Sequence, residues 1–137
     1  MARFVVAPLA DIPPGGRKLV EAAGRPIVIF NVGGKLYAVS NRCPHAGGSL
    51  VHGKQVGLLD SAEPGNYRYS REGEIIRCPW HSWEFDLVTG KSRCDPTTVR
   101  VKSYAVEVAP GSKLAEGAYK VDTFAVSVED DYVVLTV

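Results

Sequence analysis

Two short segments of this sequence combine thiol and imidazole side chains at spacings that suit metal binding. Cys43 and His45 are separated by one residue, and Cys78 and His81 by two. Thiolates are soft, charged donors that favour iron–sulfur clusters, and imidazoles are neutral donors that suit iron, copper and zinc. Each of these residues alone would be read as structural. Two such pairs, 35 positions apart, predict that all four side chains bind one metal centre.

Such a donor set has a definite redox consequence. With both cysteines on one iron and both histidines on the other, a [2Fe–2S] cluster carries two fewer negative charges than one held by four thiolates. Adding an electron is then easier, so the potential lies above that of plant-type ferredoxins. The motif therefore indicates transfer of single electrons.

The residues next to the four donors fit the same interpretation. Pro44 and Pro79 each follow a cysteine and fix φ, which stiffens the loop. Gly47 and Gly48 allow the backbone to approach closely, and we expect them to present N–H groups to the cluster sulfurs. Three aromatic residues are expected to shield the cluster from water: Trp80, Trp83 and Phe85.

A structural Zn²⁺ site is the main alternative, because two cysteines and two histidines also suit tetrahedral zinc. Zinc fingers usually place these ligands on a compact ββα unit with a shorter separation, and that pattern is missing here. Cys94 has no partner cysteine and is expected to be an ordinary thiol. His52 is expected to be a surface histidine. A basic rim around the cluster is one interpretation of five basic residues near the motifs, but we interpret them as solvated surface charges. They are Arg42, Lys54, Arg77, Lys91 and Arg93.

The elements that must position these loops are short strands rich in β-branched and aromatic residues. Gly33-Gly34 predicts a tight hairpin turn between two of them. Arg71-Glu72-Gly73 predicts a second hairpin, between strands over Tyr67–Tyr69 and Glu74–Arg77, and the polar segment 58–67 is expected to be a loop. The other predicted strands are Arg3–Val6, Lys18–Glu21, Ile27–Val32, Lys35–Val39, Val99–Val108, Tyr119–Val128 and Tyr132–Val137.

Length and composition limit the remaining choices. A chain of 137 residues with 45% hydrophobic residues suits one domain, 1–137, with a real core. A net charge of +1 and no basic run give no reason to expect nucleic acid as a partner. No apolar run is long enough for a membrane span, and the apolar N-terminal stretch meets Pro8 and Asp11 too early for a signal peptide. Three cysteines argue against a disulfide framework, so we expect a cytoplasmic protein.

The two motifs resemble those of the Rieske family, whose pattern is C-x-H-x-G followed by C-x-x-H. The resemblance covers Asn41 to Ser92 and is specific at the motifs. It implies an all-β fold, an antiparallel sandwich or small barrel with a cluster-binding subdomain at about 41–95. It also implies one [2Fe–2S] cluster on Cys43, His45, Cys78 and His81. Soluble members of this kind accept electrons from a flavin-dependent reductase and pass them to a terminal oxygenase.

Departures from the family pattern refine this expectation. Members from cytochrome complexes join the two motifs by a disulfide, whereas this chain has Gly48 and Trp80 at the matching positions. Those members also place serine and tyrosine hydroxyls against the cluster, where Trp83 and Phe85 stand here. Fewer hydrogen bonds to sulfur lower the potential. We therefore predict a potential at the low end of the Rieske range, roughly −150 to −50 mV.

Other functional classes fit the sequence less well. Rieske oxygenases that react with O₂ need a mononuclear iron held by two histidines and a carboxylate. Once His45 and His81 are assigned to the cluster, only His52 remains, so the chain is expected to be a carrier and not an enzyme. It would also suit a small subunit of a larger oxidoreductase. Purely structural relatives have lost their ligands, and this chain keeps all four.

Overall fold

The computed structural model describes residues 3–44, 47–63, 65–79, 83–93, 95–114, 120–121, 127 and 129–137. The chain divides into two compact units. Unit 1 comprises Met1–Ser40 and Ser103–Val137, and unit 2 comprises Asn41–Lys102. The sequence leaves the first unit at the end of one strand and returns to it at the start of another, so unit 2 is an insertion in the sequence of unit 1.

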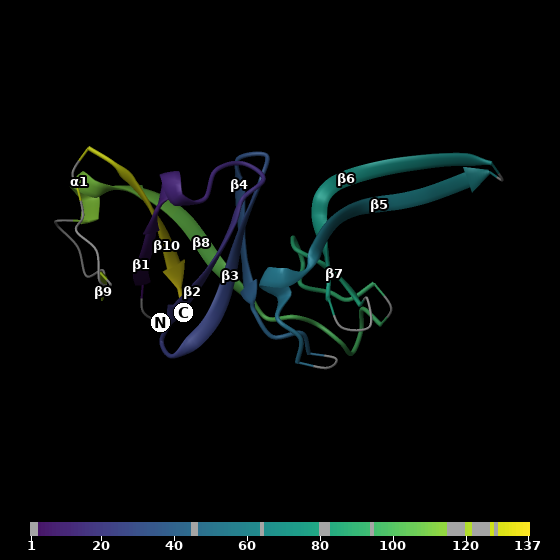
Figure 1. Cartoon of the computed structure of the whole chain (residues 1–137), viewed down its shortest axis with the longest axis horizontal. Coiled ribbons are helices and arrows are strands. Elements are labelled where there is room, and N and C mark those ends of the chain that lie inside the picture. The colour runs from purple at the N-terminus through teal and green to yellow at the C-terminus, as the bar shows by residue number, and fades with distance from the viewer. Residues whose placement is uncertain are drawn as a thin grey trace. The chain divides into compact units, whose positions relative to one another are not determined.

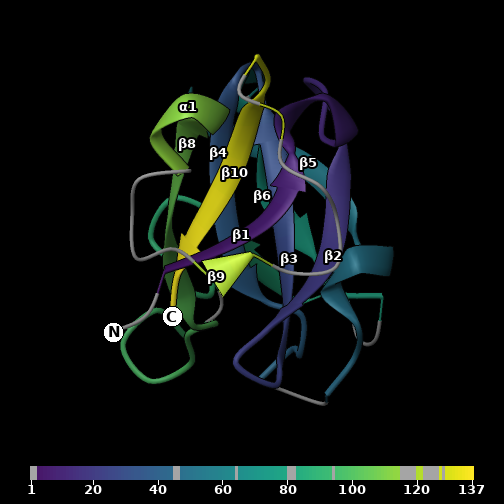
Figure 2. The ribbon, with the colours of Figure 1, turned by 90° about the vertical axis from the view of Figure 1, so that its left-hand side faces the viewer.

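Unit 1 is a seven-stranded sheet in the order β2-β3-β4-β8-β10-β1-β9. Its pairings are antiparallel except for that of β1 with the short β9. The sheet curls, with β1 and β10 in front of β3 and β4 in Figure 2, and β1 also contacts β2. The predicted all-β antiparallel class is therefore confirmed. The strands are β1 (Arg3–Pro8), β2 (Arg17–Ala22), β3 (Arg25–Val32), β4 (Lys35–Ser40), β8 (Ser103–Pro110), β9 (Lys120–Val121) and β10 (Asp131–Thr136).

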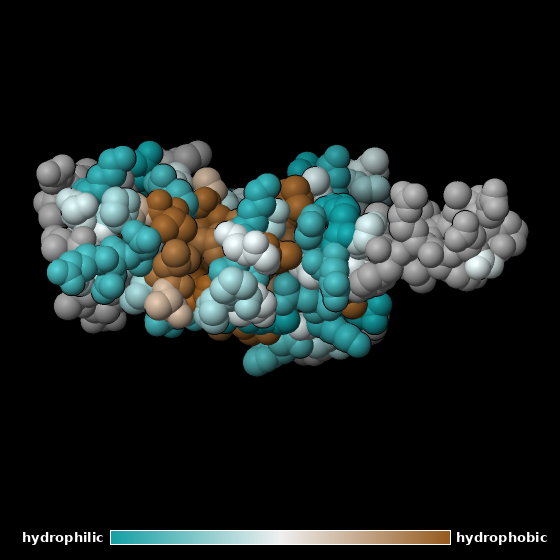
Figure 3. All heavy atoms as spheres, turned by 90° about the horizontal axis from the view of Figure 1, so that it is seen from above, coloured by the Kyte–Doolittle hydropathy of each residue, from teal (hydrophilic) through white to brown (hydrophobic). Residues whose placement is uncertain are grey.

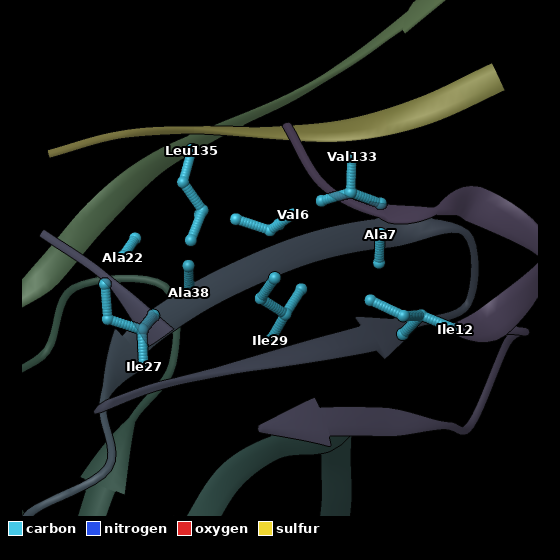
Figure 4. Close-up of a cluster of buried hydrophobic side chains, with 9 residues drawn as sticks. All are labelled: Val6, Ala7, Ile12, Ala22, Ile27, Ile29, Ala38, Val133 and Leu135. Atoms are coloured by element: carbon cyan, nitrogen blue, oxygen red, sulfur yellow. The ribbon is translucent and has the colours of Figure 1, made fainter. Parts of the chain in front are cut away.

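The core of unit 1 lies inside this curled sheet. Figure 4 shows side chains from β1, β3, β4 and β10 pointing toward one another. Burial of such aliphatic groups contributes roughly 1.5–3 kcal/mol each and is the main force that holds the strands together. The cluster consists of Val6, Ala7, Ile12, Ala22, Ile27, Ile29, Ala38, Val133 and Leu135.

The predicted hairpin at Gly33-Gly34 is confirmed. β3 ends at Val32, β4 begins at Lys35, and these two residues pair across the turn. Both glycines have positive φ, 60° and 97°, the conformation that a two-residue turn of this kind requires. Asn31 fixes the turn further, because its Oδ1 accepts a hydrogen bond of 2.8 Å from the N–H of Gly34.

Unit 2 is a three-stranded antiparallel sheet in the order β5-β6-β7, with loops on either side (Figure 1). Its strands are β5 (Lys54–Glu63), β6 (Asn66–Arg77) and β7 (Glu84–Asp86). Three short helical turns lie within the described part of the chain. η2 (Leu50–His52) belongs to unit 2, and η1 (Leu9–Asp11) and α1 (Gly111–Leu114) belong to unit 1.

The prediction of a polar loop over 58–67 was wrong. These residues are the outer part of a long β5–β6 hairpin, in which Leu58 pairs with Ser70 and Ser61 with Tyr67. The turn is confined to the few residues between Glu63 and Asn66. Polar composition was misleading because the backbone N–H and C=O groups of a two-stranded ribbon form hydrogen bonds across the strands. Such a ribbon does not need an apolar face along its whole length.

The second hairpin predicted at Arg71-Glu72-Gly73 was also wrong. Both flanking segments belong to one strand, β6, and the register passes from Val56–Ile75 to Leu58–Ser70. The four residues 71–74 therefore lie opposite Gly57 alone, as a bulge. Arg71 and Gly73 have positive φ, 52° and 81°. Gly73 does indicate a residue with positive φ. This conformation occurs in bulges as well as in turns, and here it belongs to a bulge.

Other predicted strand bounds also differ from the observed ones. β8 begins at Ser103, not Val99, because Val101 donates its N–H to Gly90 in a loop of unit 2. Of the predicted strand over Tyr119–Val128 only β9 and Ser127 lie within the described residues, and Ser127 is not in a strand. Strands β5 and β7 were not predicted. In the part of the chain that the structure describes, no helix is long and apolar enough to cross a membrane.

Candidate metal centre

The two cysteines of the predicted donor set lie at equivalent places, just beyond a strand. Cys43 follows β4 and Cys78 follows β6 directly. Neither is in a disulfide, and each is only 1% exposed. His45 and His81 lie outside the described residues, as does Cys94. Among the residues described, no group of three or more His, Cys, Asp and Glu gathers, and only two of the four predicted ligands fall in those ranges.

The first ligand loop is closed by a short ladder of hydrogen bonds. Asn41, 8% exposed, accepts from Leu50 N–H at its carbonyl and from Val51 N–H at Oδ1, both at 2.8 Å. Arg42 and Ser49 form an isolated bridge, and Cys43 N–H donates to the Gly48 carbonyl at 2.8 Å. These bonds hold the backbone on both sides of the loop together.

The second ligand loop is closed in the same way. Arg77 and Glu84 pair across β6 and β7, and Cys78 N–H then donates to the carbonyl of Trp83 at 2.7 Å. The segment 79–82 is therefore tied at both ends to a strand pair. Strand ends hold loops in fixed positions, which is what a metal site needs.

Gly53 brings the two loops together. A Cβ built at this position would overlap the carbonyl oxygen of Arg77 and lie 3.0 Å from the carbonyl oxygen of Leu50. Leu50 ends the ladder of the first loop, and Arg77 immediately precedes Cys78. The backbones of the two loop bases therefore approach as closely as they do only because residue 53 has no side chain.

Aromatic side chains adjoin the second loop, as expected. Phe85 is fully buried, and its ring stacks on that of Trp83 with centroids 6.4 Å apart and planes 27° apart. Trp83 is half-buried, and Trp80 lies outside the described residues. Buried rings exclude water and lower the local dielectric, which is how a protein shell influences a bound metal centre.

One expectation about the first loop needs correction. Gly47 was expected to present its N–H to a cluster sulfur, but this N–H donates to the carbonyl of Cys43 at 2.8 Å. Gly47 has φ +77°, with nothing within 4 Å of a built Cβ. Its role is therefore to turn the chain. The intraloop bond satisfies a backbone group that would otherwise be left without a partner.

Charged side chains brace the second loop, a feature that sequence reasoning missed. Glu84 Oε2 accepts bonds from Arg77 Nε at 3.2 Å and Nη2 at 2.9 Å. Glu84 Oε1 lies 3.5 Å from Arg93 Nη1, and the Arg93 N–H donates to the Glu84 carbonyl at 2.9 Å. Two arginines thus share one carboxylate beside the loop. Of the basic residues considered for a rim, Arg42, Lys54, Lys91 and Arg93 are exposed.

A second charged group braces the β6 bulge. Arg71 donates from Nη2 to Asp86 Oδ1 at 2.7 Å and from Nε to Glu74 Oε1 at 3.0 Å. The hydrogen bond with Asp86 raises the pKa of Arg71. Burial opposes ionisation of Asp86, but the bonds from Arg71 and from the Val88 N–H outweigh it and lower the pKa of Asp86. Both groups are therefore charged at neutral pH, and they tie the bulge to β7.

The roles of Asn41, Gly53 and Glu84 were not predicted from the sequence. Arg77 and Glu84 stand one residue before Cys78 and one residue after Trp83, so this pair of opposite charges is a local signal. Asn41 and Gly53 carry no comparable signal, because their contacts depend on the tertiary structure. His52 is exposed at the end of η2, so the prediction of a surface histidine is confirmed.

The donor chemistry fits an iron–sulfur centre. Two buried thiols that form no disulfide lie in loops closed by backbone hydrogen bonds, and the stacked rings of Trp83 and Phe85 adjoin the second loop. Thiolates buried in this way are soft ligands shielded from solvent, which is the environment such clusters require.

Comparisons with known proteins agree with this chemistry. The Rieske [2Fe-2S] domain matches residues 2–105. A 3-phenylpropionate/cinnamic acid dioxygenase ferredoxin subunit from Shigella flexneri serotype 5b is 32% identical over 112 residues, which are 81% of this chain and 90% of that protein.

Solved structures give the same result for the fold. A complex of reduced oxygenase and oxidized ferredoxin in carbazole 1,9a-dioxygenase matches with a TM-score of 0.58 at 26% identity, covering 96% of this chain and 91% of the matched chain. The ferredoxin of carbazole 1,9a-dioxygenase from Nocardioides aromaticivorans IC177 matches with a TM-score of 0.58 at 22% identity, covering 97% of each chain. The second match bears on the fold alone.

Proposed function

This chain belongs to the Rieske [2Fe–2S] domain family, and we propose that Cys43, His45, Cys78 and His81 hold its cluster. The chain takes one [2Fe–2S] cluster and is an electron carrier, not a catalyst. The observation that supports the ligand assignment best is the burial of both thiols in two loops of similar closure. We also propose that unit 2, which begins at Asn41, is the cluster-binding subdomain.

The cluster, when bound, supplies reversible uptake of one electron. The chain's own residues supply ligands, exclude water and keep the loops closed. Cys43 and Cys78 supply thiolate ligands from positions that water does not reach, and Asn41 keeps the first loop closed. Arg77 and Glu84 keep the second loop closed. A rigid shell of this kind limits rearrangement between oxidation states, which favours fast electron transfer.

For the partners, we propose a flavin-dependent reductase as donor and a terminal oxygenase as acceptor. Support comes from the relatives, one of which is a ferredoxin subunit of a dioxygenase and another a ferredoxin in a complex with an oxygenase. Contacts of electron-transfer proteins are usually small and transient. We propose the cytoplasm as the location, since three cysteines do not suggest a disulfide framework and the relatives are ferredoxin subunits.

The test is the visible spectrum of the anaerobic protein before and after dithionite, with EPR of the reduced form. We expect broad bands that bleach, and an average g below that of all-cysteine clusters. A redox titration should give roughly −150 to −50 mV, because no hydroxyl donor is expected at the cluster sulfurs. A potential above about +100 mV would contradict this part of the proposal.

Matched variants test the ligand assignment. C43S, C78S, H45Q and H81Q should each abolish or strongly alter the spectrum, whereas C94S and H52Q should leave it unchanged. Loss of colour in H52Q or C94S would shift the assignment to those residues. A colourless wild-type protein with one zinc per chain would replace the carrier by a structural zinc domain.

A further inference from the structure

Unit 1 contains none of the four proposed ligands, yet it has a cavity of its own of about 650 Å³. Residues from η1 and the loop after it, from β8 and from the turn before β10 line this cavity. Figure 3 shows hydrophobic residues gathered at the surface beside hydrophilic ones on the face seen from above. Electron transfer through unit 2 does not account for this groove.

The floor of the groove is apolar. Ile12 is fully buried beneath it, Leu9 is half-buried, and Pro13 is exposed. Val108 of β8 is 45% exposed, one of three large apolar side chains among the described residues with such exposure. The cavity volume of about 650 Å³ lies within the range of ligand sites in proteins. Its apolar floor suits one or two side chains of a ligand.

The groove is rigid before anything binds. Asn31, 4% exposed, donates from Nδ2 to the carbonyl of Ile12 at 2.7 Å, and its backbone exchanges hydrogen bonds with Gly15 and Gly16. These bonds fix the segment after η1 on the β3–β4 hairpin. Binding in a preformed groove does not require the protein to order itself, which improves affinity.

One wall of the groove is acidic. Glu129, Asp130 and Asp131 are consecutive, exposed and part of the lining. No ion pair within the described residues involves these three carboxylates. Their backbone is held in place, because the Asp130 carbonyl accepts from the Gly111 N–H at 2.8 Å. The wall therefore presents negative charge, on a backbone that is held in place, next to an apolar floor.

We propose that this groove docks a segment of a partner protein in which an apolar or prolyl residue lies between lysines or arginines. The apolar residue would occupy the floor over Val108, and the basic residues would face the acidic wall. Charge complementarity selects this occupant over an acidic or neutral segment. The proposal goes beyond electron transfer, because a segment held by unit 1 occupies no residue of the ligand loops.

The test uses the full-length protein with its cluster and two fluorescent peptides, Lys-Lys-Leu-Pro-Leu-Lys-Lys and Glu-Glu-Leu-Pro-Leu-Glu-Glu. We expect the basic peptide to bind about tenfold more tightly than the acidic one at low salt, and this preference to fall in 0.5 M NaCl. Amide NMR shifts should map to Ala10, Asn31, Gly34 and Val108 and not to unit 2. The reduction potential should not change on binding, so this proposal can fail without affecting the ligand assignment.

Variants of exposed residues locate the binding. D130N/D131N should weaken the basic peptide about tenfold, and V108N should weaken both peptides. E21Q on β2 removes one charge from the same unit outside the groove and should have no effect. An unchanged far-ultraviolet circular dichroism spectrum and melting temperature report that each variant is folded. Equal binding of the two peptides, or unchanged affinity in D130N/D131N, would overturn the proposal. Concentration-dependent self-association lost in V108N would make a second copy of this chain the occupant, and overturn it too.

Discussion

Gly53 shows how one residue links two parts of the candidate site. Its backbone lies against the carbonyl of Arg77, so a methyl group there has to displace the base of the second ligand loop. We expect G53A to destabilise the protein by about 1–3 kcal/mol, since overpacking costs this much when the neighbour is backbone. The measurements are the free energy of unfolding in urea and the cluster absorbance per chain.

G47A is the matched control for that prediction. A Cβ at position 47 meets nothing within 4 Å, so the only cost is the positive φ, about 1–2 kcal/mol. Cluster content should fall in G53A and stay close to wild type in G47A. Equal cluster content in the two variants would mean that the close approach at Gly53 does not position the ligands.

Glu84 is the negative charge that two arginines share beside the second loop. E84Q keeps the shape of the side chain but removes that charge. Since reduction adds negative charge to the cluster, loss of a nearby carboxylate should raise the potential. At an effective dielectric typical of partly exposed sites the effect is about 1 kcal/mol or less, which is up to about 40 mV for one electron.

A redox titration of E84Q against E72Q checks this. Glu72 is an exposed acid of the β6 bulge that forms no ion pair among the described residues, and its removal should shift the potential less. A lower potential in E84Q would show that disorder of the loop outweighs the change in charge.

At the scale of elements, the bulge in β6 is the feature that distinguishes unit 2. It interrupts the pairing with β5 at Gly57. The residues of β6 that follow it, Ile75–Arg77, pair with β7. Arg71, with a positive φ that L-residues seldom adopt, holds the bulge through Asp86 and Glu74. Gln55 adds a bond of 3.0 Å from Nε2 to the Gly73 carbonyl. Side chains from all three strands thus fix an irregular backbone.

We expect D86N to destabilise the protein by about 1–2 kcal/mol at pH 7, because it removes a charge-assisted hydrogen bond. The pKa of Asp86 is lowered in the fold, so its contribution is complete above its unfolded pKa, about 3.9. The contribution is lost as pH falls through the folded pKa. The difference between wild type and D86N should therefore shrink in acid.

Urea unfolding at pH 7 and pH 3.5 measures both effects. D11N is the control, since Asp11 pairs with Lys18 at 3.3 Å with both side chains well exposed. Such surface pairs contribute about 0–1 kcal/mol, so D11N should change little at either pH. A destabilisation of D86N that is the same at both pH values would mean that Asp86 acts through packing and not through its charge.

At the scale of the whole molecule, the two units differ in charge and in composition. Unit 2 has nine basic and seven acidic residues, a net charge of +2, and unit 1 has seven basic and eight acidic residues, a net charge of −1. Unit 1 has a continuous sheet and an aliphatic core, whereas unit 2 has a small sheet with long loops. Metal binding is coupled to folding where the ligands lie on such loops.

Removal of the cluster should therefore affect the units unequally. We expect hydrogen exchange in the loops of unit 2 to accelerate by about a hundredfold or more, while β3 and β10 of unit 1 keep most of their protection. Mass-spectrometric exchange of the holo- and apo-proteins measures this. Equal loss of protection in both units would show that they unfold as one cooperative unit.

The sequence by itself determined the class of fold and the family, and it predicted the chemistry of the site. Type and spacing predict Cys43, His45, Cys78 and His81 as ligands. The Gly33-Gly34 turn and the strands of unit 1 follow from turn residues and from β-branched and aromatic runs, because these signals are local. Only the tertiary structure decided that 58–67 belongs to a long hairpin, that 71–74 form a bulge, and that Gly47 bonds within its own loop. It also decided that Gly53 meets Arg77 and that Glu84 lies between two arginines. These are contacts between residues distant in sequence, and they depend on register, which no local pattern specifies.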